Sequence, residues 1–219
     1  MKYNPVRNIF IVGTALAINN TWEEILEDYQ IDFYRIRKRE EIKRVQRGQI
    51  VLLTINLLTE LKREMKKLLR IRCQKVMLIF DESDAITNGS SKRTKAMLSV
   101  FRKCRYKVLA TGTLTRNNVV EAAPQLELLY NNSIHYLAKN EWIYRFKNGQ
   151  MEKNRNFFLN QPFPAYKRGY ELFSYSYLPK KITVFGLEKA NQDIYNASFL
   201  DELLEKTVIT KNFEEVVGR

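Results

Sequence analysis

The sequence has few of the residues that build cross-links, metal clusters or repetitive chains. It contains 2 Cys, 1 His, 5 Pro and 8 Gly in 219 residues. Two cysteines, Cys73 and Cys104, cannot form a disulfide framework or a zinc cluster, and this little Gly and Pro excludes a collagen-like or low-complexity chain. No apolar run approaches the ~18 residues that a membrane helix needs, and the first residues, MKYNPVRN, lack an apolar signal core. These absences predict a cytoplasmic protein without a membrane anchor.

Acidic residues are outnumbered. The chain has 37 Lys and Arg against 24 Asp and Glu, a formal net charge of +13, with 45% hydrophobic residues for a buried core. A basic surface attracts nucleic acid, other polyanions or acidic membrane, although a basic globular protein need not bind any of them. Three basic clusters, at 35–47, 62–75 and 92–107, flank successive apolar runs. Each alone is typical of a solvated helix face, but together they favour a surface that follows phosphates.

Short apolar runs alternate with stretches of helical periodicity over the first 110 residues. The runs stay apolar on both faces, which is typical of strands in a parallel sheet covered by helices on both sides. They are Ile9–Val12, Ile50–Ile55, Val76–Phe80 and Lys107–Ala110. The order predicts an α/β domain with a mostly parallel sheet and helices on both faces.

The composition changes near Asn131. Residues 131–196 are rich in Asn, Tyr, Phe and Lys and predict an insertion or appended subdomain. Its aromatic-rich segment, 142–177, is interleaved with basic residues; it predicts a small satellite core, with stacking on bases or sugars as the alternative. A helical pattern near 199–204 leads to Thr207–Thr210, which we expect to return as a strand of the first sheet. The expected organisation is therefore 1–130, 131–196 and 197–219.

The stretch VMLIFDESD, residues 76–84, is the most informative part of the chain. A buried strand runs directly into Asp81 and Glu82, and ligands of open α/β sheets lie at the carboxyl ends of the strands. A carboxylate there is costly unless it is solvated, paired or bound to a cation. Asp81 would suit Mg²⁺, directly or through water, and Glu82 would suit orientation or deprotonation of an attacking water. The plain alternative is a strand that ends in a polar turn.

A second strand ends in polar residues. In KVLATGTLTRNN, residues 107–118, the apolar run Lys107–Ala110 is followed by Thr111, Gly112 and Thr113. Two hydroxyls around a glycine allow a tight turn that bonds to a neighbouring strand end. The turn would then couple the loop at 81–84 to a second site.

Taken in order, these segments resemble the motifs of superfamily-2 helicases and translocases. VMLIFDESD is similar to motif II, the D-E-x-D/H box, and VLATGTLTRNN to motif III, in a form most like the T-G-T-P of Swi/Snf-type DNA translocases. IFIVGTALAINNTWEEI at 9–25 is similar to motif Ia, IVLLTINLLTEL at 50–61 to motif Ib, and DELLEKTVITKNFEEVVG at 201–218 to the segment that closes the first lobe. The chain is thus identified as resembling a first RecA-like lobe. Leu114 departs from the pattern, which has Pro there.

The resemblance implies a role for each matching residue. Asp81 would hold Mg²⁺ through water, Glu82 would be the catalytic carboxylate, and Asp84 would join them in binding the nucleotide. Coupling would fall to Ser83, Thr111, Gly112 and Thr113, and contact with the nucleic-acid backbone, expected to be duplex DNA, to Thr14, Thr54, Asn56 and Arg116. Contacts of this kind go to phosphate and sugar and carry little sequence information.

The phosphate-binding loop, G-x-x-x-x-G-K-[ST], does not occur in the sequence. Its backbone and Lys hold the nucleotide phosphates, and in the family a second RecA-like lobe supplies an arginine finger. We therefore expect ATP and Mg²⁺ to be cofactors of a longer parent enzyme, with this chain alone binding neither and remaining inactive.

Two other classes of function stay open at this stage. A non-catalytic nucleic-acid-binding or scaffolding protein with a degenerate motor fold would also be basic and lack the loop. A nuclease with Asp81, Glu82 and Asp84 as its metal cluster is less favoured, because further acids or a His are missing at the other strand ends. The single His135 lies in the Asn-rich insertion, where we expect a structural or surface role.

Overall fold

The computed structural model describes residues 8–70, 75–131, 140–157, 159, 166–182, 188–189, 193–211 and 215. Its contacts divide the chain into two units, Met1–Asn131 and Asn132–Arg219. Each unit is therefore described by itself. His135 and Cys73, singled out from the sequence, lie outside the described residues.

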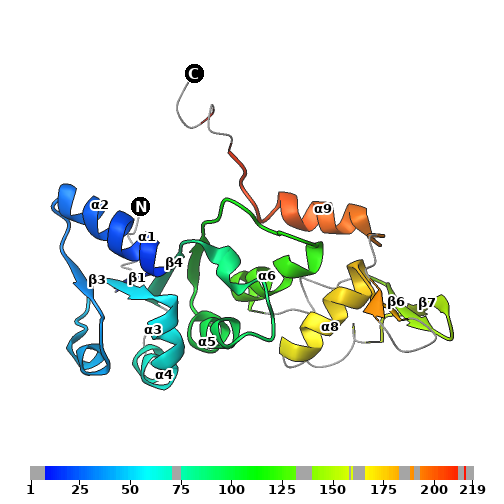
Figure 1. Ribbon diagram of the computed structural model, residues 1–219, viewed down its shortest axis with the longest axis horizontal. Helices are drawn as coiled ribbons and strands as arrows, with labels where there is room; N and C mark the ends of the chain where they lie inside the picture. The colour runs from blue at the N-terminus through cyan, green and yellow to red at the C-terminus, as the bar shows by residue number, and fades with distance from the viewer. Residues whose placement is uncertain are drawn as a thin grey trace. The chain divides into compact units, whose positions relative to one another are not determined.

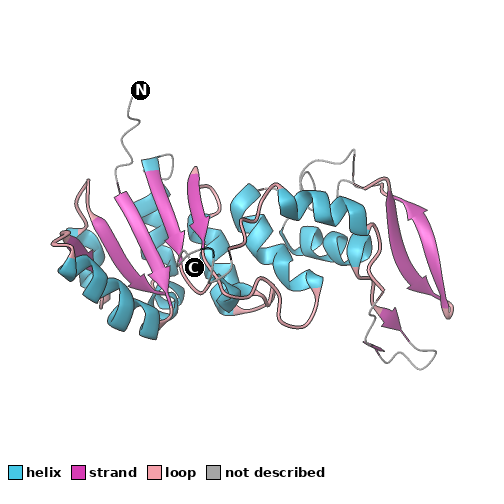
Figure 2. Ribbon diagram, turned by 90° about the horizontal axis from the view of Figure 1, so that it is seen from above, coloured by secondary structure: helices cyan, strands magenta, loops and turns pink. Residues whose placement is uncertain are grey.

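The first unit is built on a five-stranded sheet in which every neighbouring pair is parallel (Figures 1 and 2). The strand order is β2-β3-β1-β4-β5. The strands are β1 (Asn8–Gly13), β2 (Phe33–Arg35), β3 (Ile50–Thr54), β4 (Val76–Phe80) and β5 (Tyr106–Leu109). The predicted α/β class and the four predicted strands are confirmed, and β2 is a fifth strand that the apolar runs did not indicate.

Helices cover both faces of this sheet. The chain after β1 forms α1 (Ala15–Ala17), a π-helical turn (Ile18–Trp22) and α2 (Glu23–Asp28) on one face; α3 (Ile55–Glu60), α4 (Lys62–Arg70) and α5 (Lys92–Phe101) lie on the other (Figure 1). Successive residues of a strand point to opposite faces. Ile11 therefore packs with Ile18 and Leu26 on the first face, whereas the ring of Phe10 lies 5.8 Å from that of Phe101 on the second. This double burial explains why the inner positions of the central strands β1, β3 and β4 are apolar.

Short 3₁₀ helices and one further α-helix complete the first unit. They are Arg39–Arg44, Ser83–Ile86, Val119–Ala122 and α6 (Ala123–Tyr130). Three helices begin at a residue whose hydroxyl accepts a backbone N–H of the first turn: Thr14 for α1, Thr54 for α3 and Ser91 for α5. Such caps satisfy N–H groups that have no partner within the helix. The local sequence thus fixes where α1 and α3 begin directly after β1 and β3.

The edge strand β5 carries a partly buried lysine. The Lys107 ammonium donates to the Arg102 carbonyl oxygen at 2.8 Å. Burial lowers the pKa of Lys107 to about 8, from an ordinary value of 10.5. Between these two values the folded chain has released a proton that the unfolded chain still holds.

This difference sets the expected pH dependence of stability. The free energy of unfolding should rise as the pH increases from about 8 toward 10.5, because the unfolded state binds more protons in that window. Lys107→Met should flatten this rise and make the protein more stable at pH 7, where the wild-type protein buries a charged ammonium. Urea unfolding of both proteins at pH 7, 8, 9 and 10 measures the difference. Parallel curves for the two proteins would contradict the assignment.

The second unit contains an antiparallel hairpin, β6 (Trp142–Lys147) and β7 (Gln150–Arg155), and α8 (Tyr166–Tyr177). Asn148 and Gly149 join the strands with φ angles of 51° and 80°, the left-handed pair that a two-residue hairpin turn requires. A two-stranded ladder of β8 (Lys181–Ile182) with β9 (Glu188–Lys189), and helix α9 (Ala197–Glu205), follow.

The hairpin has two different faces. Ile143 packs on Leu172 of α8, and Phe173 and Tyr177 are also fully buried, so the predicted satellite core is present. On the other face, the Lys153 ammonium lies 4.5 Å from the centre of the Trp142 ring. Stacking on bases by this aromatic and basic face stays a prediction.

Thr207–Thr210 does not form the strand expected from its sequence. The backbone N–H groups of Thr207 and Val208 both donate to the Leu204 carbonyl oxygen and close the end of α9. The hydroxyl of Thr207 donates to the Leu203 carbonyl oxygen. These donors bond to carbonyl groups of the last helical turn, so the run ends a helix instead of joining a sheet. By its contacts, the segment 197–219 belongs to the same unit as 132–196.

Candidate functional site

The predicted site residues of the first unit follow strands that end at one edge of the sheet. The parallel register pairs Gly13 with Thr54, Val12 with Phe80, and Phe80 with Leu109. Along this edge the strand ends run in the order β3, β1, β4, β5. The residues that follow them therefore divide into two groups. Thr14, Thr54 and Asn56 follow β1 and β3, and the carboxylates and the Thr-Gly-Thr turn follow β4 and β5.

Asp81 stands directly after β4 with both carboxylate oxygens engaged. Its backbone N–H donates to the Val12 carbonyl oxygen at 2.8 Å and extends the ladder by one bond. Oδ1 accepts the N–H of Glu82 at 2.9 Å, and Oδ2 accepts the indole Nε1–H of Trp22 at 2.8 Å. Each oxygen keeps a further lone-pair direction. A half-buried carboxylate held in this way fits a water-mediated contact with Mg²⁺.

Glu82 differs from its neighbour in both conformation and environment. Its side chain is exposed, and its backbone has φ 52° and ψ 51°, the left-handed region. A non-glycine residue there costs about 1–2 kcal/mol. The Glu82 carboxylate forms no hydrogen bond or ion pair with the part of the chain that the structure describes. The position thus places an unpaired carboxylate in solvent at the expense of backbone strain.

Ser83 and Asp84 turn inward and connect to the segment after β5. The N–H of Ser83 donates to the Ala110 carbonyl oxygen at 2.9 Å, and its hydroxyl donates to Oε1 of Gln125 at 2.8 Å. Nε2 of Gln125 in turn donates to the Leu114 carbonyl oxygen at 2.9 Å. Ser83 is fully buried and Gln125 is 2% exposed, so the bond between their side chains is shielded from water.

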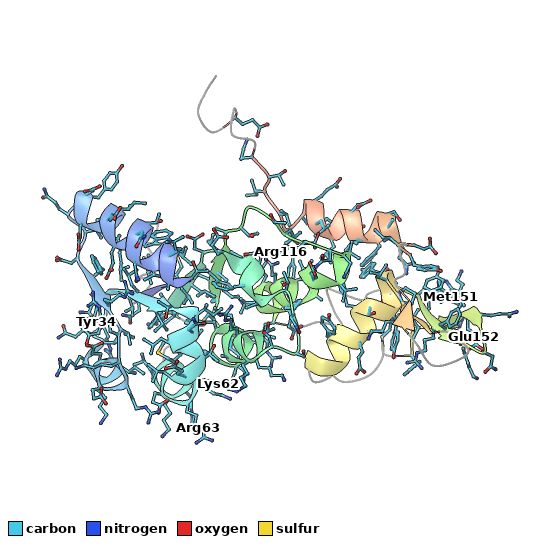
Figure 3. All side chains as sticks on the ribbon, in the orientation of Figure 1. Tyr34, Lys62, Arg63, Arg116, Met151 and Glu152 are labelled. Carbon is cyan, nitrogen blue, oxygen red and sulfur yellow. The ribbon has the colours of Figure 1, made fainter. Side chains whose placement is uncertain are left out.

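Arg116 forms an ion pair with Asp84. The guanidinium comes from the loop between β5 and α6 (Figure 3) and is 64% exposed, whereas the Asp84 side chain is 7% exposed. The loop is held in shape by Glu121, whose carboxylate accepts the backbone N–H groups of Arg116 and Asn117. Burial alone would raise the pKa of Glu121, but the hydrogen bonds from Asn117 and Arg116 outweigh it and lower this pKa. Contact of Arg116 with nucleic acid stays a prediction, and in this structure its partner is a carboxylate.

The Thr-Gly-Thr turn is closed on itself. The Thr111 hydroxyl donates to the Thr113 carbonyl oxygen at 3.0 Å and lies 3.1 Å from the Thr113 N–H. A Cβ added at Gly112 would meet nothing within 4 Å. The described bonds between the two loops run instead through Ala110, Gln125 and Arg116. Coupling by Thr111, Gly112 and Thr113 remains a prediction.

Thr14, Thr54 and Asn56, three of the four residues predicted to contact nucleic acid, lie at helix starts. The Thr14 hydroxyl accepts the Ala17 N–H at 3.2 Å, and the Thr54 hydroxyl accepts the Leu57 N–H at 3.3 Å. Oδ1 of Asn56 accepts Nε–H of Arg93 from α5 at 3.0 Å. Arg93 and Asn56 are both exposed. An arginine of the third basic cluster is thereby placed beside the expected backbone contacts.

Sequence reasoning missed three residues of this edge: Trp22, Gln125 and Arg93. Trp22 lies within the segment 9–25 that is similar to motif Ia, but the sequence indicated no role for its side chain. Gln125 is an amide among buried apolar residues of α6, and a buried amide must have partners, so its position was the available signal. Nothing in the sequence indicated which member of the third basic cluster meets Asn56.

Within the described ranges, no three His, Cys, Asp or Glu side chains come together in a way that would hold a metal ion. Asp81, Glu82 and Asp84 therefore do not form the cluster that the nuclease hypothesis needs. Over the same ranges, no helix has the length and apolar character required to cross a membrane.

Comparison with known proteins adds to this geometry. A family model described as an SNF2-related domain matches residues 2–216. A solved structure, the Sulfolobus solfataricus SWI2/SNF2 ATPase core in complex with dsDNA, is similar to this chain with 20% sequence identity and a TM-score of 0.47. The similarity covers 60% of this chain and 26% of that chain, so the chain matches about a quarter of the length of this relative. No curated protein sequence matches the chain.

Proposed function

Because this chain belongs to the family of SNF2-related domains, we propose that it is a first RecA-like lobe of a motor that couples Mg-ATP hydrolysis to movement on duplex DNA. One observation carries the proposal. The sheet brings a carboxylate pair after β4 and a set of polar helix starts after β1 and β3 to the same edge. Adjacent sites for nucleotide and nucleic acid are what such coupling needs.

The residues of this edge would have separate roles in metal binding, hydrolysis and coupling. Asp81 would hold a water of the Mg²⁺ shell, and Glu82, which is exposed and has no partner among the described residues, would orient or deprotonate the attacking water. The Mg²⁺ ion held in this way would supply charge neutralisation at the nucleotide phosphates. Asp84 and Ser83 would pass the state of the nucleotide to the segment after β5 through Arg116 and Gln125.

The conformation of Glu82 favours a motor over a scaffold with a degenerate motor fold. A scaffold gains no stability from an unpaired carboxylate on a strained backbone. Strained residues are retained where the surroundings and the function demand them.

We propose that phosphate-binding and arginine-finger groups come from sequence other than these 219 residues, since the loop pattern is absent from them. This chain alone would then show no ATP hydrolysis, with or without DNA. Turnover by the isolated chain that Glu82→Gln abolishes would refute this part of the proposal.

DNA binding tests the nucleic-acid side. We expect weak, sequence-independent binding whose logarithm falls linearly with the logarithm of salt concentration, with a slope near −0.9 per phosphate contacted. Arg93→Ala should make the slope shallower by about 0.9, the contribution of one phosphate. Fluorescence anisotropy of a labelled duplex, at several salt concentrations, measures both.

The matched control is Arg47→Ala. Arg47 is an exposed arginine that precedes β3, so it lies toward the opposite edge of the sheet. It should leave the slope closer to that of the wild-type protein than Arg93→Ala does. Equal effects of the two substitutions would show that binding follows net charge and not this edge, and a flat salt dependence would contradict the proposal.

A further inference from the structure

Trp22 connects the two halves of the edge. It belongs to the helical segment that follows β1, whereas the carboxylate that its indole contacts follows β4. We propose that Trp22 is a positioning residue that holds the Asp81 carboxylate and transmits nucleic-acid binding to it. The inference rests on the proposed function only in one respect, that nucleic acid binds after β1 and β3 and nucleotide binds after β4.

The carboxylate of Asp81 is fixed at both oxygens. Trp22 donates to Oδ2 at 2.8 Å and the backbone N–H of Glu82 donates to Oδ1 at 2.9 Å. The second donor is part of the loop itself, so Trp22 is the side chain that selects one rotation of the carboxyl plane. A hydrogen bond to an ionised acceptor is also stronger than one between neutral groups.

The indole is itself firmly placed. Trp22 ends the π-helical turn Ile18–Trp22, and the wider turn changes where the following side chains point; such turns are frequent at functional sites. Trp22 packs on the buried cluster of Ile18 and Leu26. The next residue, Glu23, is paired with Arg35 at 2.7 Å and with Arg37 at 3.2 Å. The helical segment that carries the indole is therefore held by apolar packing and by ion pairs.

The same helical segment begins at Thr14, one of the expected backbone contacts. The Thr14 hydroxyl caps it through the Ala17 N–H, and Trp22 stands eight residues further along, at the end of the π-helical turn. A phosphate that engages the start of this segment would shift or stiffen it, and the indole at its far end would carry that change to Asp81.

Indole resonances in ¹⁵N–¹H spectra of the full chain test this directly, because the sequence has 2 Trp. Trp142→Phe assigns the two cross-peaks. Asp81→Ala should move the Trp22 indole proton upfield as its acceptor is lost. Glu82→Ala, at the neighbouring carboxylate, is the matched control and should move it less. If the Asp81 variant fails to fold, hydrogen exchange of the Trp22 indole in the wild-type protein replaces it and should be slower than in free tryptophan.

Mixed-sequence duplex DNA forms the second arm. At saturation, judged by anisotropy in the same buffer, the Trp22 indole peak should shift, and the shift should shrink in Asp81→Ala. An indole peak indifferent to Asp81→Ala, or unmoved by bound DNA, would overturn the inference. Absence of DNA binding by anisotropy would instead refute the proposed function, while the first arm, which needs neither DNA nor metal, still decides whether Trp22 holds this carboxylate.

Discussion

Gln125→Ala should lower the free energy of unfolding of this protein by about 2–4 kcal/mol. The side chain is 2% exposed, accepts from the Ser83 hydroxyl and donates to the Leu114 carbonyl oxygen. Alanine leaves the buried Ser83 hydroxyl without its bond, at about 1–3 kcal/mol, and the partly buried Leu114 carbonyl oxygen without its bond, at about 1 kcal/mol. Urea unfolding followed by circular dichroism measures the loss.

Two comparisons make this result specific. Gln150→Ala removes an exposed glutamine at the start of β7 and should change stability by less than about 0.5 kcal/mol. Adding Ser83→Ala to Gln125→Ala should cost less than the sum of the two single changes, because each single change already breaks their common bond. A loss below 0.5 kcal/mol for Gln125→Ala would mean that the network does not stabilise the fold.

Glu82→Gln should have its large effect on catalysis and little on stability. In a polypeptide that combines this chain with a phosphate-binding loop and a second lobe, ATP hydrolysis should fall by about 10²–10⁴-fold, the usual contribution of a general base. Nucleotide binding should be largely spared, because glutamine keeps the size of the side chain and Asp81 is untouched. Steady-state hydrolysis and equilibrium nucleotide binding separate the two effects.

In this chain alone the melting temperature should stay unchanged or rise slightly. The Glu82 carboxylate lies beside that of Asp81 and has no partner in the described part of the chain that its removal would leave unsatisfied. Glu60→Gln, an exposed carboxylate at the end of α3, is the control and should behave alike in the melt but keep full hydrolysis. A loss of several degrees for Glu82→Gln would identify Glu82 as a structural carboxylate.

The parallel sheet could be predicted because its central strands β1, β3 and β4 are buried on both faces. Residues such as Phe10 and Ile11 on β1 are apolar whichever way they point, so the runs stand out from the polar helices between them. β2 escaped because it is a three-residue edge strand, Phe33–Arg35, whose last residue belongs to a basic cluster. The run Thr207–Thr210 has strand-like residues, but its N–H groups complete a helix end.

The candidate site was predictable where one residue follows one strand. Asp81 and Glu82 lie at the carboxyl end of β4 because the apolar run stops there. Bonds between distant segments were not predictable: Trp22 and Asp81 are 59 residues apart, and Ser83 and Gln125 are 42 apart. The sequence pattern showed a polar residue in each loop, but only the fold decides which of them meet.

Because the backbone of Glu82 is left-handed, the amino acid at position 82 indicates whether selection for hydrolysis still acts. Glycine or asparagine would relieve about 1–2 kcal/mol of strain at this position, and within the described ranges the glutamate side chain forms no hydrogen bond or ion pair that offsets it. In any descendant lineage released from the need to hydrolyse ATP, drift should replace Glu82 with one of these residues early, while the buried Ser83 and Gln125 persist because the fold depends on them. The order in which these three positions decay would therefore date the loss of motor function in relatives of this chain.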